Sequence, residues 1–496
     1  MCVEVESDGD CVGGFHAFTI RVDRAPRVRS NITVQQWANS GLDLHVELNR
    51  AHLRESLERS LRETVQSGRL GAGALLPPSR TLAGDLGVAR NTVAEAYAQL
   101  VAEGWLTARQ GSGTRVALHP AGPAAAAGRR AGPEPVARYD LRPGFPDVTA
   151  FPRGEWLSSA RSALMRAPAD VFGYGDGRGR PELRAALAAY LARARGVRVS
   201  ADSVVVCSGF SQALWLLGSA LRAEGGKAVG VESHGHRLHR EVLAGTGLAV
   251  RGLRVDDHGA RPEGLEGLDA VLLTPAHQFP LGVALDPGRR TQLVKWAAST
   301  GAVVIEDDYD GEFRYDRRAV GAMQALSPEL VVYAGTASKT LAPGLRLAWL
   351  VLPARLVGPV LEQRLLTDLH TGALDQLTMA EFINSGRYDR HVRRARLSYR
   401  RRRDRLVATL ARRLPDMALR GLPAGLHAVL ELPESATEAE VVARAAARGL
   451  ALEGLGSYAM APDASPPALV VGYGTPPAHA YTSALARLCT TLAEHD

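Results

Sequence analysis

A segment rich in alanine, proline and glycine divides this 496-residue sequence into two unequal parts. Residues 119–138 contain no regularly spaced large apolar side chains, so this stretch is not expected to join a hydrophobic core. We interpret it as a linker between a domain at residues 42–118 and a domain at residues 139–496. Residues 1–41 show no periodic pattern and are assigned to an N-terminal extension.

Composition and charge narrow the function only in part. Hydrophobic residues make up 46% of the chain and charged residues 22%, as in ordinary globular proteins. No apolar run approaches the roughly 18 residues that a membrane span needs, and the N-terminus does not resemble a signal peptide. We therefore expect a cytoplasmic protein without a membrane partner. The four cysteines include no C-x-x-C pair, so no metal site is expected.

The net charge of +7 has a local origin. Ten arginines and two aspartates fall within residues 387–405, a local excess of eight that is larger than the excess of the whole chain. Such a run is typical of a solvated helix face. Net charge alone therefore does not identify a nucleic acid as the partner.

Residues 42–118 carry a pattern of three helices and a hairpin. Large apolar residues recur at every fourth position from Leu53 to Val65, as in an amphipathic helix. A second helix fits residues 79–86, with Ser79 as its expected cap, and a third fits residues 90–103. The following WLTARQGSGTRV predicts strand, glycine turn and strand. This is the order of a winged helix-turn-helix.

Apolar strands alternate with helical patterns in the longer part of the chain. The predicted strands lie at residues 204–207, 270–273, 302–305 and 330–333. Alternation of this kind indicates an α/β fold with a mostly parallel sheet.

The shorter domain resembles a known family. LPPSRTLAGDLGVARNTVAEAYAQLVAEGWL, followed by GSGTRV, is similar to the GntR-type winged helix-turn-helix over residues 42–118. The resemblance implies binding to double-stranded operator DNA, with contacts from Arg80, Arg90, Asn91, Thr92, Gln110 and Gly111. This domain holds nine arginines and eight acidic residues, so we expect a few placed contacts instead of a broad positive surface.

Lysine is scarce, and one lysine has an unusual setting. Of Lys227, Lys295 and Lys339, only Lys339 lies in a small polar loop, GTASKTLAPGLR, directly after an apolar strand. Such a loop can hold an amine out of bulk water to form a Schiff base with an aldehyde. Lys227 and Lys295 are expected to be ordinary surface lysines.

Two further motifs fit a pyridoxal cofactor at the same edge of the sheet. The strand at 302–305 opens into EDDYD, where a carboxylate can keep a pyridine nitrogen protonated and a phenol can bond a ring hydroxyl. Acid clusters after strands also bind Mg²⁺, but the tyrosine and the lysine loop favour pyridoxal. Residues 208–211 join a strand to a helix N-terminus that suits a phosphate, with Arg346 as countercharge.

From residue 139 onward these motifs resemble the type I aminotransferase fold, and its pairing with a GntR head resembles the MocR subfamily of regulators. The resemblance implies pyridoxal 5′-phosphate (PLP) as cofactor, with Lys339 as its covalent anchor. Cofactor contacts are implied for Lys339, Asp307, Tyr309, Arg346, Ser211, Gly209, Thr336, Tyr174, His277 and His236. Tyr174 matches a family position that reaches the partner subunit's cofactor, which implies a homodimer.

Two positions depart from the aminotransferase pattern. His236 stands where the family has an aromatic side chain over the cofactor ring. No arginine occurs in residues 468–474, where aminotransferases have one that holds the substrate carboxylate.

These features favour a transcriptional regulator that senses PLP or a PLP adduct and is not an enzyme. The alternatives are an active aminotransferase with a vestigial DNA-binding head, and a regulator that no longer binds the cofactor.

Overall fold

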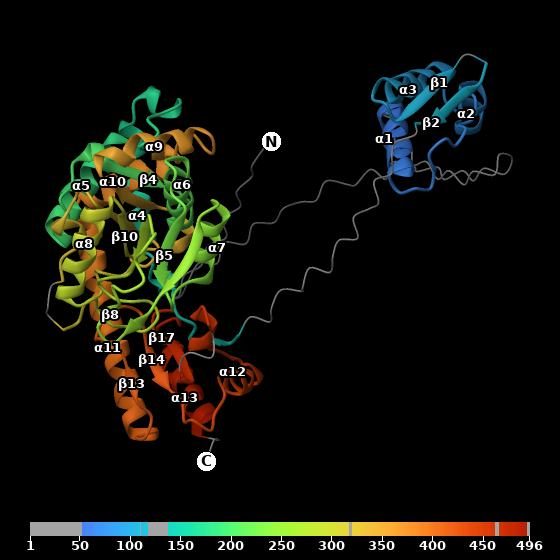
Figure 1. The fold of residues 1–496 in the computed structure, drawn as a ribbon. Helices are drawn as coiled ribbons and strands as arrows, with labels where there is room; N and C mark the ends of the chain where they lie inside the picture. The colour runs from blue at the N-terminus through green and yellow to red at the C-terminus, as the bar shows by residue number, and fades with distance from the viewer. Residues whose placement is uncertain (1–51, 110, 118–136, 317–319, 462–465, 494–496) are drawn as a thin grey trace, which may run out of the picture. The chain divides into compact units, whose positions relative to one another are not determined.

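The computed structural model describes residues 52–109, 111–117, 137–316, 320–461 and 466–493. Its contacts divide the chain into two compact units, residues 1–134 and residues 135–496 (Figure 1). We refer to them as the smaller and the larger unit. No helix among the described residues is long and apolar enough to cross a membrane.

The described residues of the smaller unit form three helices and one β-hairpin. The helices are α1 (Leu53–Gln66), α2 (Ser79–Leu86) and α3 (Arg90–Ala102). Strands β1 (Leu106–Arg109) and β2 (Gly113–Val116) pair antiparallel. Apolar side chains from all five elements form one core, in which Leu57, Leu82, Val93, Leu100 and Leu106 are buried. The predicted order of elements is confirmed.

The expected cap of α2 is wrong. Pro78 occupies the N-cap position and Ser79 is already the first helical residue. The ring of Pro78 fixes its φ at a value that fits the extended residue before a helix. Proline has no side-chain acceptor, so no side chain caps the first N–H groups of α2. At the other end, Gly87 adopts the left-handed conformation that closes the helix.

A seven-stranded sheet forms the centre of the larger unit. Its strand order is β4-β12-β11-β10-β9-β5-β6. Neighbours pair in parallel, except that β12 is antiparallel to both β11 and β4. The strands are β4 (Val204–Cys207), β5 (Ala228–Glu232), β6 (Ala249–Leu253), β9 (Ala270–Leu273), β10 (Val303–Asp308), β11 (Val331–Thr336) and β12 (Ala348–Val351). The predicted mostly parallel α/β sheet is confirmed.

Helices cover both faces of this sheet (Figure 1). One face packs against α6 (Phe210–Ala223), α7 (Arg237–Gly245) and α9 (Ala354–Leu365). The opposite face packs against α5 (Pro181–Arg195), α8 (Pro287–Thr300) and α10 (Ala373–Asn384), and α4 (Arg153–Arg166) lies on α10. Parallel strands covered on both faces are expected to be continuously apolar, as β4 and β9 are.

A smaller four-stranded sheet follows toward the C-terminus. Its order is β13 (Leu419–Arg420), β14 (His427–Glu431), β17 (Ala468–Gly472) and β16 (Glu453–Gly454). It shares a core with α11 (Arg387–Arg413), α12 (Glu438–Ala447) and α13 (Tyr481–Leu492). Two short pairs complete the fold: β3 (Tyr139–Asp140) with β15 (Leu450–Ala451), and β7 (Val255–Asp256) with β8 (Gly259–Ala260).

The arginine-rich run lies on α11, as predicted, and most of its arginines face solvent. Arg387 and Arg403 are half-buried, and Arg402 differs from all the others. It is buried, its Nη2 lies 2.6 Å from Asp147 Oδ2, and its Nη1 donates to the carbonyl oxygen of Pro476 at 2.7 Å. This arginine therefore ties the helix to two distant segments.

Candidate functional site

A cavity of about 320 Å³ opens at the carboxyl edge of the seven-stranded sheet. Its walls come from β10, from the loop after β11, and from the first turns of α6 and α7. The structure brings together seven of the residues predicted from sequence: Lys339, Asp307, Tyr309, Arg346, Ser211, Thr336 and His236. Gly209, His277 and Tyr174 are not in its lining.

Lys339 and Asp307 both line this cavity, and each affects the pKa of the other. The Lys339 ammonium donates to the carbonyl oxygen of Gly144 at 2.5 Å. Burial lowers the pKa of Lys339 and raises the pKa of Asp307, and the attraction between the two groups opposes both shifts. The site therefore holds an amine whose proton is less tightly bound than usual, close to a dry carboxyl group.

Asp307 lies inside a strand, although the sequence predicted that the strand ends before it. β10 continues through Asp308, because Glu306 and Asp308 both have hydrogen-bonding partners inside the protein. Glu306 accepts hydrogen bonds from the backbone N–H groups of Met323 and Gln324, and Asp308 pairs with Arg195. Alternation along the strand then directs Asp307 to the opposite face, where the cavity lies.

Tyr309 reaches the cavity and has His277 behind it. The Tyr309 hydroxyl lies 3.1 Å from His277 Nδ1, and the same nitrogen lies 2.8 Å from Asp310 Oδ2. Only one hydrogen bond can form at that nitrogen, so the imidazole tautomer decides between tyrosine and aspartate. His277 therefore contacts the Tyr309 hydroxyl from outside the lining of the cavity.

The start of α6 and Arg346 form one end of the cavity. Arg346 adopts a left-handed backbone conformation (φ 51°), and its Nη2 donates to the carbonyl oxygen of Ser208 at 2.9 Å. Gly209 is the N-cap of α6, with φ 95°. A Cβ added there would lie closer than 3.0 Å to the Arg346 guanidinium, so the missing side chain lets the cation approach the helix N-terminus.

His236 stands at the cavity with its ring stacked on Phe279, the centroids 4.4 Å apart and the planes inclined by 5°. Burial lowers the pKa of His236 to about 4, so the imidazole is neutral near pH 7. Phe279 belongs to the TPAHQFPLG motif, but sequence reasoning did not single it out.

Four further cavity or supporting residues were also missed. Gln278 donates to Glu232 Oε2 at 3.2 Å and to the carbonyl oxygen of His234 at 2.9 Å. Glu232, His239 and Arg240 line the cavity directly. For His239 and Arg240 the available signal was helical spacing, because positions three and four after His236 fall on the same face of the helix that follows it. Glu232 and Gln278 carried no comparable local signal.

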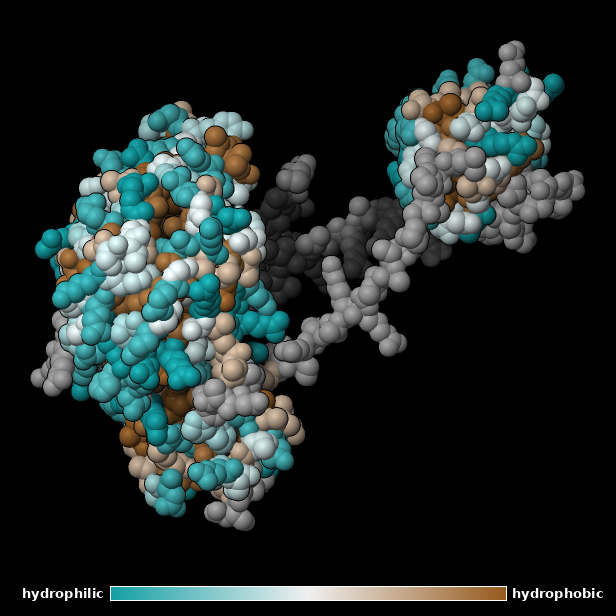
Figure 2. Space-filling view, in the orientation of Figure 1, coloured by the Kyte–Doolittle hydropathy of each residue, from teal (hydrophilic) through white to brown (hydrophobic). Residues whose placement is uncertain are grey.

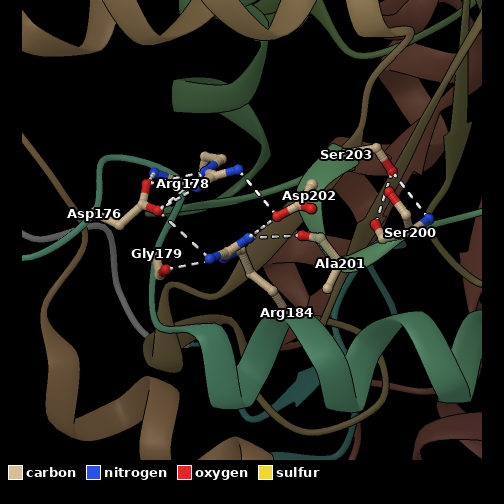
Figure 3. Close-up of polar contacts among 8 residues, drawn as sticks. All are labelled: Asp176, Arg178, Gly179, Arg184, Ser200, Ala201, Asp202 and Ser203. Atoms are coloured by element: carbon tan, nitrogen blue, oxygen red, sulfur yellow. Dashed lines mark hydrogen bonds and ion pairs between the residues drawn. The ribbon is translucent and has the colours of Figure 1, made fainter.

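Tyr174 lies away from the cavity and is 89% exposed. Its loop is fixed at the base by charged contacts (Figure 3). Asp176 pairs with Arg178 at 2.7 Å, and Arg184 donates to the carbonyl oxygens of Gly179 and Ala201. These contacts hold the base of the loop, and the tyrosine side chain points into solvent.

The predicted DNA contacts lie on the surface of the smaller unit. Arg80 on α2 and Arg90 and Asn91 at the start of α3 are exposed, and Thr92 is half-buried. No side chain caps α3, so its first N–H groups are not bonded by a capping residue. Gly111 is exposed in the hairpin turn with φ 82°, whereas Gln110 lies outside the described residues.

Each of the two units matches the model of a known protein family. Residues 53–116 match the model for bacterial regulatory proteins of the gntR family, and residues 150–460 match aminotransferase class I and II. The fold and site therefore define a helix-turn-helix regulator joined to an aminotransferase-like unit.

Curated relatives share this arrangement. The pyridoxine biosynthesis transcriptional regulator PdxR of Corynebacterium glutamicum is 33% identical over 410 residues, covering 81% of this chain and 88% of PdxR. The probable rhizopine catabolism regulatory protein MocR of Rhizobium meliloti is 34% identical over 419 residues, covering 79% and 84%. The chain belongs to the MocR subfamily of GntR-type transcriptional regulators.

Solved aminotransferases share the fold of the larger unit. An archaeal alanine:glyoxylate aminotransferase superposes with a TM-score of 0.66 at 25% identity, covering 72% of this chain and 91% of that one. The kynurenine aminotransferase of Pyrococcus horikoshii gives 0.65 at 24% identity, covering 73% and 92%.

We expect Gly209→Ala to weaken the binding of PLP, used as a phosphate-bearing probe, by about tenfold or more, because its methyl group displaces Arg346. Gly225→Ala is the matched control, since Gly225 has φ 93° but open space around its Cβ position. Both glycines have a similar positive φ, so we expect both variants to lose stability. Only Gly209→Ala places a methyl group against Arg346, so only this variant should lose affinity for PLP. Equal affinities in a PLP titration followed by absorbance would contradict this role for Gly209.

Glu232 makes folding stability depend on pH. Burial raises its pKa from 4.5 to about 7, so the protonated form is favoured in the folded state. Its stabilising contribution is present below pH 4.5 and is lost as the pH rises through 7, at a cost of about 3 kcal/mol. Glu232→Gln should flatten the dependence of Tm on pH between 5 and 8, whereas the control Glu241→Gln on the exposed side of α7 should not. An unchanged slope in Glu232→Gln would refute this assignment.

Proposed function

We propose that the larger unit of this regulator binds PLP and that the cofactor, or an adduct of it, is the signal that controls DNA binding. The observation that carries the proposal is the position of Lys339. Its ammonium group lies in one cavity with the carboxyl group of Asp307 and with Arg346, which bonds Ser208 just before the start of α6. A fully exposed lysine would not support this function.

The cavity residues fit the three chemical parts of PLP. Lys339 would bind the aldehyde carbon covalently, Asp307 would face the pyridine nitrogen, and Tyr309 would face the ring hydroxyl. Ser211, Thr336 and Arg346 would hold the phosphate, with Gly209 giving it access to backbone N–H groups. PLP supplies an aldehyde that condenses reversibly with primary amines.

Two histidines complete the proposed site. His236 would cover one face of the cofactor ring, in place of a larger aromatic side chain. His277 would orient the Tyr309 hydroxyl from behind, through the contact at 3.1 Å.

We further propose that the chain works as a homodimer in which Tyr174 reaches the cofactor of the second copy. Its loop and the end of α9 expose apolar side chains, and brown atoms gather over α9 in Figure 2. The exposed side chains are Phe172, Tyr174, Leu365, Leu366 and Leu369. Large exposed apolar patches mark interfaces, and a second copy would cover this one.

Regulation without sustained transamination is the activity we propose. The named relatives are transcriptional regulators. All five residues of β17 are buried and none is an arginine, so this strand offers no carboxylate clamp.

Lys339 is expected to be the single site of PLP attachment. Borohydride reduction of the PLP-treated chain, followed by peptide mapping, should place the label on the peptide that contains Lys339. Lys339→Ala should carry no label and Lys295→Ala, an exposed control on α8, should be labelled fully. A label on Lys227 or Lys295, or on no lysine, would disprove the assignment.

Arg90→Ala should abolish most sequence-specific DNA binding, since a bidentate arginine–guanine pair contributes about 1–3 kcal/mol of discrimination. The measurement is the affinity for DNA selected from a random pool by the wild-type chain, at one salt concentration. Arg59→Ala removes the same charge from the exposed side of α1 and should have little effect, and both variants should bind PLP normally. Equal losses in the two variants would show that charge alone is responsible.

A further inference from the structure

Three cationic side chains among the described residues line the cavity, and two of them have a task in the proposed binding of PLP. In the proposed function, Lys339 attaches PLP and Arg346 holds its phosphate, and both residues line the cavity. The third is Arg240, on α7.

Arg240 has a fixed position but no ionic partner among the described residues. Its Nη1 donates to the carbonyl oxygen of Tyr458 at 2.9 Å, which holds the side chain toward the C-terminal sheet. The neighbouring carboxylate, Glu241, pairs instead with Arg237 at 2.6 Å. Partial burial of Arg240 lowers its pKa, but an arginine remains charged at any physiological pH. A half-buried, unpaired cation is stabilised by an incoming anion.

The other polar groups near Arg240 are not available to bind an anion. His234, His236 and His239 are neutral near pH 7, because burial lowers the pKa of each, with a further contribution from Arg240. The carboxyl group of Glu232 is already bonded by Thr274 and Gln278. Arg240 is therefore the cation of the cavity wall that remains available to a ligand.

Its place in the wall differs from that of Arg346. His239, the preceding residue, packs on Phe210 at the start of α6, with ring centroids 4.9 Å apart. Arg240 instead contacts the turn at Tyr458, which adjoins the C-terminal sheet that holds β17. A ligand joined to the cofactor can therefore meet Arg240 from the side away from the phosphate end.

We propose that Arg240 binds the carboxylate of the effector, a primary amine that also carries a carboxylate, and so replaces the arginine that β17 lacks. This inference rests on the proposed binding of PLP at Lys339. An amino acid would then be held at two points, by its amine at the cofactor aldehyde and by its carboxylate at Arg240.

The test uses the full-length chain loaded with PLP. Glycine, alanine, β-alanine and 5-aminopentanoate are each compared with the matched amine that lacks the carboxylate. The measured quantity is the amine concentration that half-saturates the change in cofactor absorbance. For at least one amino acid, Arg240→Gln should raise this concentration about tenfold or more, with little change for its matched amine. Arg240→Lys should restore part of the affinity, and Arg251→Gln, at an exposed arginine on β6, should behave as wild type.

The outcomes separate the inference from the function on which it rests. Failure of the wild-type chain to take up PLP would overturn the proposed function itself. If PLP binds, two results would overturn the role of Arg240. One is a wild-type chain that prefers no amino acid over its matched amine. The other is an Arg240→Gln variant that weakens amines and amino acids equally.

Discussion

Three consecutive acidic residues in one buried strand impose the constraint around which the larger unit is organised. Glu306, Asp307 and Asp308 all lie within β10, between neighbouring strands on both sides. A buried carboxyl group without a partner is costly, so each of the three requires its own solution. Glu306 is bonded by two backbone N–H groups, and Asp308 is held by Arg195 and by the hydroxyl group of Tyr333 at 2.8 Å. Of the three, only Asp307 lines the cavity, where the charge of Lys339 offsets part of the cost of its burial.

This arrangement couples the fold to the chemistry of the site. Because β10 and β11 are parallel and in register, with Asp307 opposite Ala334, the strand that carries the carboxyl group and the loop that carries the lysine reach the same edge. The start of α6 and the start of α7 close the cavity from the side. Burial of Lys339 and Asp307 in this cavity strengthens the charge–charge interaction between them.

Much of this could be predicted from the sequence, and the remainder has a physical reason. The helices of the smaller unit, the strand positions and the residues of the lysine loop follow from local periodicity and short motifs. The partners of Asp308 and Asp147, which are Arg195 and Arg402, lie 113 and 255 residues away and carry no local signal. The end of β10 was misplaced because acidic residues resemble a loop when their partners are unknown. Phe279, Gln278 and Arg240 stand beside motifs that were recognised, but their contacts arise only when separate segments meet.

Control of DNA binding by the cofactor is the central claim, and one measurement tests it directly. The affinity of the full-length chain for DNA selected from a random pool is measured with and without PLP, at one salt concentration, for the wild type and for Lys339→Ala. A change in affinity on adding PLP is predicted for the wild type and none for Lys339→Ala. Equal wild-type affinities with and without PLP, or the same response in Lys339→Ala, would contradict the claim.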